Sequence, residues 1–396
     1  MKSEIFEILK KSLAYIDENG LESYDPFDAL TSPIILKLTF NNSLLKRYAI
    51  QAVKRLPVNV RPCLKIKKKI HVMSMAHLVL YECLEYHDSG ESQHKSLIEK
   101  YINIIKQNAI DHERYYSWGL GFRYSTRFVD THSNTPNIFT TLNIANSLIE
   151  AAQILENDEC IYIAEKAGSF IIERLGFVKE ESALWFKYYP DQMIPVYNVN
   201  AMVGAFFLNL WKITSNDEYK DFSQKAILFI EKHQNNDGSW YYARDDAGKW
   251  IDGFHTGYIL ESLLFYLSEF NDSRVAHSLA IGANFYKDYL FTDDGLPKYQ
   301  SISVLPMDSQ NFAQAIQTLA KLSVYDNDFL TYANKAYEWS IQYLFRDLGD
   351  IGYFIAARNK LLKNQNYYLR WSQAPMILAM KYLQLANSGK LEDKSK

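Results

Sequence analysis

The chain has 396 residues, of which 48% are hydrophobic and 22% charged, and its 43 Lys and Arg against 46 Asp and Glu give a formal net charge of -3. This composition excludes disorder over most of the chain, and the balance of charges excludes a global basic field that would attract nucleic acid. Only 16 Gly and 10 Pro argue against a turn-rich β-sandwich.

The first predicted element is an amphipathic helix over residues 1–20, whose charges are spread throughout and do not resemble a signal peptide. No uninterrupted apolar run reaches about 18 residues, so we expect no membrane span and a cytoplasmic protein. Cys63, Cys83 and Cys160 are too widely spaced for a disulfide framework or a zinc site, and we expect neither metal nor cofactor. The basic run Lys65–Lys69 is either a solvated loop or a phosphate site.

A pattern that recurs about every 58 residues organises the rest of the chain. Each copy has an aromatic patch and a polar loop, followed by an almost wholly apolar helix. Alignment of the helices makes five positions equivalent, separated by 58, 57, 55 and 61 residues: Thr140, Asn198, His255, Gln310 and Trp371. A sixth, less regular copy begins at His71.

Amphipathic helices alternate with these apolar ones, and their apolar residues recur at helical spacing. A helix that is apolar on most sides must be covered on most sides, so six such hairpins closed in a ring predict an all-α (α/α)6 toroid. The N-terminal helix and the segment 43–56 would complete the outer wall. We expect a single domain over residues 1–387 and a disordered tail over 388–396.

In such a ring the loops that precede the apolar helices gather at one end, so a functional site is expected there. Four residues are candidates for catalysis: His255, Asp252, Tyr258 and Asp308. Eleven more are candidates for substrate binding: Asp25, Asp28, Arg123, Tyr124, Asn137, Asn198, Asn200, Trp240, Gln310, Arg370 and Trp371.

The spacing of Asp252 and His255 suits a carboxylate that orients an imidazole for proton transfer, because residues three apart share a helix face. Asp252 could equally be a helix N-cap, and His255 a satisfied core histidine. Tyr258 is a core phenol or a second proton donor.

The other candidates also have two interpretations. Asn198 and Asn200 are caps or amide contacts to a sugar. Arg370 is a fork for a substrate carboxylate beside Trp371, or the partner of Asp25 or Asp28 in a salt bridge. Trp240 is a stacking platform for a sugar or part of the core.

The segment QNNDGSW from Gln234 fits the QxxxGxW pattern of triterpene-cyclase toroids, in which the motif is structural. The acidic motifs DxDD and DDxxD that terpene cyclases use are absent from the sequence. The pattern therefore indicates the architecture rather than an activity.

The chain resembles a bacterial family of exopolysaccharide-biosynthesis proteins within the six-hairpin glycosidase-like superfamily. Five segments that span nearly the whole chain carry the likeness: YDPFDAL from Tyr24, NVNAMVGA from Asn198, DGSWYY from Asp237, WIDGFHTGYILESL from Trp250 and RWSQAPM from Arg370. The resemblance implies an (α/α)6 toroid and a role near bacterial surface glycans, but no catalytic assignment.

Three functions remain open. The first is an enzyme that acts on a surface polysaccharide or its precursor, by hydrolysis with Asp252 and Asp308 or by lyase or C5-epimerase chemistry with His255 or Tyr258 as base. The second is a non-catalytic glycan-binding protein associated with polysaccharide-assembly machinery. The third is a terpenoid-cyclase-like enzyme, which an apolar site would favour.

Overall fold

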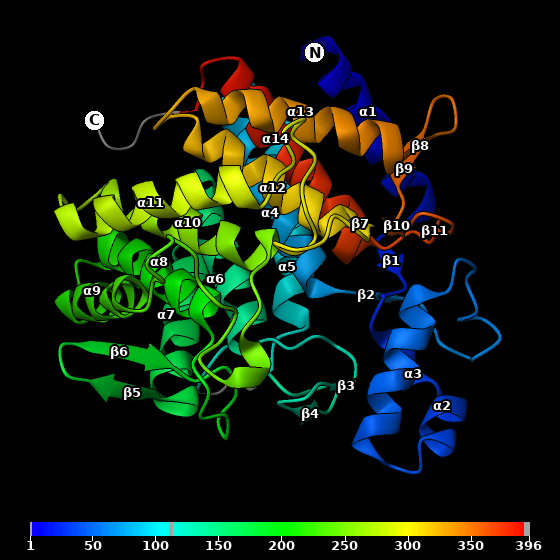
Figure 1. Cartoon of the computed structure of the whole chain (residues 1–396), viewed down its shortest axis with the longest axis horizontal. Coiled ribbons are helices and arrows are strands. Elements are labelled where there is room, and N and C mark those ends of the chain that lie inside the picture. The colour runs from blue at the N-terminus through cyan, green and yellow to red at the C-terminus, as the bar shows by residue number, and fades with distance from the viewer. Residues whose placement is uncertain (1, 111–113, 392–396) are drawn as a thin grey trace.

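The computed structural model describes residues 2–110 and 114–391. Within these residues six helices form an inner ring, in which each helix contacts the next and the last contacts the first (Figure 1). They are α4 (Val72–Ser89), α6 (Ile138–Leu155), α8 (Tyr197–Thr214), α10 (Gly253–Leu267), α12 (Ser309–Leu322) and α14 (Ala374–Asn387).

A second layer of helices surrounds this ring. Its members in the described part of the chain are α1 (Lys2–Asn19), α5 (Ser92–Gln107), α7 (Asp158–Ser169), α9 (Asp217–Lys232), α11 (Ser273–Tyr289) and α13 (Asp328–Tyr343). Five of them follow an inner helix in a hairpin, whereas α1 comes from the opposite end of the chain and packs on α14. This arrangement confirms the predicted closed (α/α)6 toroid.

The two layers differ in burial as the hydrophobic pattern predicts. In α8, 13 of 18 residues are buried, because neighbours cover the helix on most sides. In α9, which forms a hairpin with α8, 7 of 16 are buried and the remaining face is polar. The inner helices therefore form the core, and the outer helices separate it from solvent.

The loops that lead into the inner helices lie together, and we call this end of the toroid the loop end. Most carry short antiparallel pairs: β1 (Glu22–Ser23) with β2 (Lys69–Ile70), β3 (Tyr124–Ser125) with β4 (Asp130–Thr131), β5 (Phe177–Glu180) with β6 (Ala183–Phe186), and β8 (Phe345–Asp347) with β9 (Gly352–Phe354). The strands β7 (Met307–Asp308), β10 (Ala357–Arg358) and β11 (Lys363–Asn364) form one small sheet in the order β11-β10-β7.

Two short helices, α2 (Pro33–Leu38) and α3 (Ser43–Arg55), stand outside the ring at the lower right of Figure 1. They pack on each other, on the 3-10 turn Asp28–Thr31 and on β3. Their own small core includes Leu30, Ile35 and Ile50. The expectation that segment 43–56 completes the outer wall was wrong, because α3 buries its apolar stripe against this local core instead.

The end of the chain lies partly outside the described residues. The predicted tail, 388–396, is described only to residue 391, where the backbone of Lys390 still donates to Leu385 at the end of α14. No helix in the described ranges is long and apolar enough to cross a membrane.

Candidate functional site

The first turn of α10 brings Asp252 and His255 into direct contact. Asp252 is the N-cap, and its Oδ1 accepts the backbone N–H of His255 at 2.8 Å. The same carboxylate lies 2.7 and 2.9 Å from Nδ1 of the His255 ring. Both interpretations of Asp252 therefore hold at once, because one carboxylate caps the helix and orients the imidazole.

The partners of Asp252 fix its charge. Burial by itself raises the pKa of this carboxyl, but the His255 ring and the hydrogen bonds from His255 and Trp250 outweigh burial and hold the pKa below its ordinary value. An ionised carboxylate only accepts hydrogen bonds, so Nδ1 of His255 carries a proton and donates it. When the ring is neutral, Nε2 is therefore the proton acceptor.

The Nε2 side of His255 is the open side. Within the described residues no hydrogen bond or ion pair involves Nε2, and the side chain is 25% exposed. The ring is held by Tyr242, whose ring meets it edge-on at 4.7 Å and stacks on Trp250 at 4.4 Å. Trp250 in turn donates to Asp252 at 2.9 Å. The imidazole is therefore fixed on one side and free on the other.

Tyr258 lies one turn further along α10. It is buried, and its ring makes edge contacts with Phe139 and Phe254. Burial raises its pKa well above the ordinary value, so the phenol keeps its proton near neutral pH.

Buried and half-buried tyrosines from several loops interact with one another near this pair. Burial raises the pKa of Tyr124 to about 12. Tyr188, Tyr189, Tyr242 and Tyr299 are raised further, and neighbouring tyrosines add to the shift in each case. The sequence analysis did not single out Tyr188, Tyr189 or Tyr299. The aromatic content of the pre-helix loops was the signal that could have found them.

Asp308 occupies the position of Asp252 on the next inner helix. It caps α12 by accepting the backbone N–H of Gln310 at 3.0 Å, and it accepts the indole N–H of Trp371 at 2.9 Å. Burial raises its pKa, in spite of the nearby Lys54 ammonium. Asp252 and Asp308 both raise the pKa of Tyr299, so both carboxylates lie near this one phenol.

Lys54 is a loop-end residue that the sequence analysis missed. It lies at the end of α3, and its Nζ is 4.5 Å from the ring centroid of Phe27 and 5.0 Å from that of Trp371. No carboxylate in the described ranges lies within ion-pair distance, and burial lowers the pKa of the ammonium despite Asp308. Lys54 is therefore a largely enclosed cation whose contacts are aromatic. No local pattern marks it, because α3 carries it to the loop end through packing.

Arg370, in contrast to Lys54, has a carboxylate partner. Its guanidinium forms two hydrogen bonds with the fully buried Asp25, at 2.5 and 2.9 Å. Burial raises the pKa of Asp25, but Arg370 outweighs burial and keeps the pKa low. Asp28 accepts from Nε of Arg61, at 2.8 and 3.0 Å, but here burial outweighs the guanidinium and raises the pKa to about 6. The salt-bridge interpretation of Arg370 therefore describes the structure, and the pair leaves no net charge for a substrate carboxylate.

Asn137 and Asn198, two of the predicted binding residues, each lie at the start of an inner helix and have one buried amide atom without a hydrogen-bond partner in the described residues. Asn137 caps α6 by accepting from Thr140 at 2.9 Å, while its Nδ2 is buried without a partner in the described part of the chain. The Oδ1 of Asn198 on α8 is in the same state. Because an unpaired buried polar group costs roughly 1–3 kcal/mol, these atoms are suited to a partner from outside the chain. Gln310 is buried on the first turn of α12.

Two further candidates, Arg123 and Asn200, have structural partners instead. Arg123 faces Asp130 at 3.4 Å and Asn41 at 3.3 Å. The Oδ1 of Asn200 accepts the backbone N–H of Phe186, with 2.6 Å between the nitrogen and the oxygen.

Trp240 is a core residue. Its indole donates to Ile230 at the end of α9, and a Cβ on Gly282 would lie 2.6 Å from its ring. Trp118 repeats the construction with Ile105 of α5, at the same 3.0 Å.

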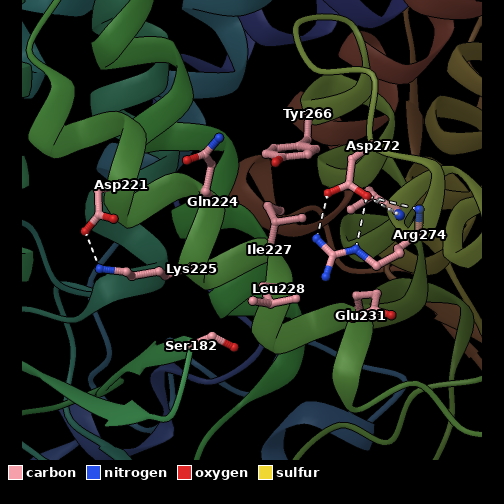
Figure 2. Close-up of a pocket in the computed structure, with 11 residues that line it drawn as sticks. Ser182, Asp221, Gln224, Lys225, Ile227, Leu228, Glu231, Tyr266, Asp272 and Arg274 are labelled. Carbon is pink, nitrogen blue, oxygen red and sulfur yellow. Dashed lines mark hydrogen bonds and ion pairs between the residues drawn. The ribbon is translucent and has the colours of Figure 1, made fainter.

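Two grooves on the described surface are not lined by these residues. Figure 2 shows one of about 310 Å³ on the outer wall, between α9 and α11. Its charged side chains bond one another, Lys225 with Asp221 and Arg274 with Asp272. No group of three His, Cys, Asp or Glu residues in the described ranges could hold a metal ion. The loop end therefore remains the candidate site.

Comparisons with known proteins agree on the fold. No protein-family model matches the chain, and no curated protein matches it. Among solved structures, it is similar to a cellobiose 2-epimerase from Bacillus thermoamylovorans, with a TM-score of 0.62 and 12% identity over 81% of this chain and 88% of that one. A GH76 α-mannanase from Bacteroides thetaiotaomicron gives 0.58 and 13% over 81% and 87%. A polysaccharide lyase gives 0.59 and 11% over 98% of both chains.

Proposed function

We propose that this protein acts on acidic sugar units of a bacterial surface polysaccharide or its precursor, and that it removes the proton beside the sugar carboxylate. The observation that carries the proposal is the His255 imidazole, which is bonded to Asp252 through Nδ1 and open at Nε2. A neutral imidazole oriented by a carboxylate is a general base suited to neutral pH.

The chemistry divides the work among three groups. Nε2 of His255 takes the proton from C5, and the electron pair passes into the carboxylate as an enolate. In a lyase the pair then expels the C4 substituent and leaves a C4–C5 double bond. In an epimerase a proton returns to C5 from the other face, for which the Tyr258 phenol, whose pKa burial raises, is the donor.

The enolate step needs a positive charge near the sugar carboxylate, because the developing charge must be stabilised where it forms. Arg370 was the sequence-based choice, but Asp25 already neutralises it. Lys54 has no ion-pair partner in the described residues and stands over Trp371. We therefore assign the carboxylate contact to Lys54, with the unpartnered amides of Asn137 and Asn198 as further contacts to the sugar.

The solved structures with this fold support a sugar substrate. They include an epimerase, a mannanase and a polysaccharide lyase, although at 11–13% identity they establish the architecture alone. The charged and amide groups at the loop end favour a polar ligand over the hydrocarbon chain of a terpenoid. The resemblance of WIDGFHTGYILESL to exopolysaccharide-biosynthesis proteins points to a surface glycan, handled in the cytoplasm.

Glycoside hydrolysis is the second candidate, and one observation favours it. The pKa of Asp308 is raised by burial while that of Asp252 is held low, and such a divided pair is typical of an acid and a base. Against it, both oxygens of Asp252 are already bonded, by His255 and Trp250, so this carboxylate is poorly placed to activate water.

Incubation with uronate-containing glycans in deuterated water separates these chemistries. An unsaturated product, or deuterium at C5, supports proton abstraction. New reducing ends, with neither an unsaturated product nor deuterium at C5, would show that the enzyme is a hydrolase and would contradict proton abstraction. Saccharide binding with no turnover of any glycan would identify a non-catalytic binding protein, a member of polysaccharide-assembly machinery.

The variant His255→Gln tests the base directly. We expect turnover to fall by about 10²-fold to 10⁴-fold, the usual contribution of a general base. Stability should change little, because the side chain is partly exposed and its Nε2 has no partner in the described residues. Thermal unfolding of the same preparation is the control, and unchanged turnover would remove His255 from the mechanism.

A further inference from the structure

The segment around α2 and α3 has a charge content unlike that of the rest of the chain. Residues 29–81 contain ten of the 43 Lys and Arg and none of the 46 Asp and Glu. A chain with a formal net charge of -3 thus carries one strongly basic region. This region includes α2 and α3, which project from the ring at the loop end (Figure 1).

Most of these charges are not used by the fold. Lys46 pairs with Asp130, Arg61 pairs with Asp28, and Lys54 is largely enclosed. The other seven form no ion pair with any described residue: Lys37, Arg47, Arg55, Lys65, Lys67, Lys68 and Lys69. All of them except the partly buried Arg47 are exposed. The region therefore presents a positive field to whatever lies outside the molecule.

The same region exposes an unusual number of large apolar side chains. Eight lie within residues 34–58: Ile34, Leu38, Phe40, Leu44, Leu45, Tyr48, Leu56 and Val58. Phe40, at the tip between the two helices, is 82% exposed. Scattered apolar residues are normal on a surface, but a contiguous group indicates an interaction site.

The helix α3 is apolar on two opposite faces. Ile50 and Val53 face the local core, whereas Leu44 and Tyr48, which are four residues apart, share the outward face. A surface helix needs only one apolar stripe to pack on its own protein. The second stripe therefore has no function within the fold that the described residues show.

A distant segment extends this surface. The turn between β10 and β11 carries Leu361, which is 94% exposed, and Leu362, flanked by Lys360 and Lys363. Asn364 next to this turn donates to the backbone oxygen of Lys54 at 2.7 Å, so the turn lies against the end of α3. The two segments are more than 300 residues apart, and both carry exposed leucines next to exposed basic residues.

We propose that α2, α3, the loop 56–69 that packs on them and the β10–β11 turn form a docking surface for an anionic lipid bilayer. Apolar side chains inserted at the acyl boundary and lysines at the headgroups are the two elements of interfacial membrane binding. The absence of acidic residues over 29–81 removes the repulsion that anionic headgroups would meet. A nucleic acid would match the charge but leave the exposed leucines and Phe40 in water. This inference is independent of the proposed chemistry and would place the loop end near membrane-bound glycan precursors.

Flotation of the full chain with lipid vesicles tests the inference. We expect binding to vesicles of phosphatidylcholine mixed with phosphatidylglycerol, weaker binding to phosphatidylcholine alone, and loss of binding as salt is raised. Lys67→Glu with Lys68→Glu should weaken binding by about 30-fold or more, since each basic residue contributes about fivefold and the reversed charges add repulsion. Phe40→Asn with Leu44→Gln should also weaken it, without unfolding, because these side chains are exposed and Asn tolerates the left-handed backbone of residue 40.

Matched controls lie on outer helices and in the turn before α13. Lys10→Glu with Lys100→Glu changes the net charge by the same amount at exposed positions outside the docking surface, and Tyr325→Asn removes an exposed ring there. Both should bind as the parent does. Equal binding by all variants, no binding to anionic vesicles, self-association through this face, or tighter binding to duplex DNA than to vesicles would each overturn the inference. Turnover of a soluble glycan by the docking variants stays unchanged, so failure here is distinguishable from failure of the proposed chemistry.

Discussion

Two carboxylates at the loop end, Asp252 and Asp25, each hold a cationic or basic partner, but only one partner is left available. Asp252 binds His255 through Nδ1 and leaves Nε2 open, in a side chain that is partly exposed. Asp25 binds Arg370 through two nitrogens, and both residues are buried. The first pair can exchange a proton with a ligand, whereas the second links the N-terminal segment to the last hairpin. A charged residue at the expected position therefore says little until its neutralising partner is known.

The largest effect that separates the two pairs is on turnover. Asp252→Asn keeps a good N-cap but offers one acceptor oxygen to three donors, which are the backbone N–H of His255, its Nδ1–H and the Trp250 indole. The imidazole should lose its tautomer and orientation, and we expect turnover to fall by about 10²-fold or more. Steady-state kinetics with a thermal-unfolding control measure this. Turnover within a few-fold of the parent would mean that Asp252 is only a cap.

A smaller and purely structural effect is expected at the second pair. Arg370→Met leaves the Asp25 carboxylate buried without its partner, and we expect the free energy of unfolding to fall by about 3–5 kcal/mol. Asp25→Asn combined with Arg370→Met should recover part of that loss, because the unpaired charge is gone. Denaturant titration of the three variants checks both statements. A single variant as stable as the parent would show that the pair does not hold the fold together.

The smallest effect concerns acid stability. The pKa of Asp25 and that of Asp252 lie below their ordinary values, so each ionised carboxylate stabilises the fold above about pH 4, and this stabilisation is lost as pH falls through the folded pKa. Each unit of difference between folded and unfolded pKa is worth about 1.4 kcal/mol. Relative to its own stability at neutral pH, the Asp25→Asn, Arg370→Met double variant should therefore lose less stability on acidification than the parent does. Unfolding midpoints measured from pH 7 down to about pH 3 test this, and parallel curves would contradict it.

The ring could be predicted from the sequence because its cause is local and repeated. An apolar helix about every 58 residues needs covering on most sides, and the alternating amphipathic helices supply the cover. The pairing of Asp252 with His255 was predictable for the same reason, since both lie in one helical turn.

What the sequence did not reveal depends on contacts between distant segments. Lys54 reaches Trp371 only because α3 packs at the loop end, and no sequence pattern within α3 predicts this contact. Arg370 is neutralised by a residue 345 positions away. Trp240 precedes an inner helix like the other loop aromatics, but its indole is needed by the end of α9. In each case the competing partner is visible only in three dimensions.

The central claim is that Nε2 of His255, which has no partner among the described residues, takes the substrate proton, and long-range proton–nitrogen correlation spectra of the histidine-labelled protein test it most directly. The protein has nine histidines, and loss of one signal in His255→Gln assigns the resonance. We expect the proton that is bonded to Asp252 to lie on Nδ1, and the Nε2 signal to shift when a uronate-containing glycan is added. A ring protonated on Nε2, or a resonance that no acidic glycan perturbs, would contradict the account.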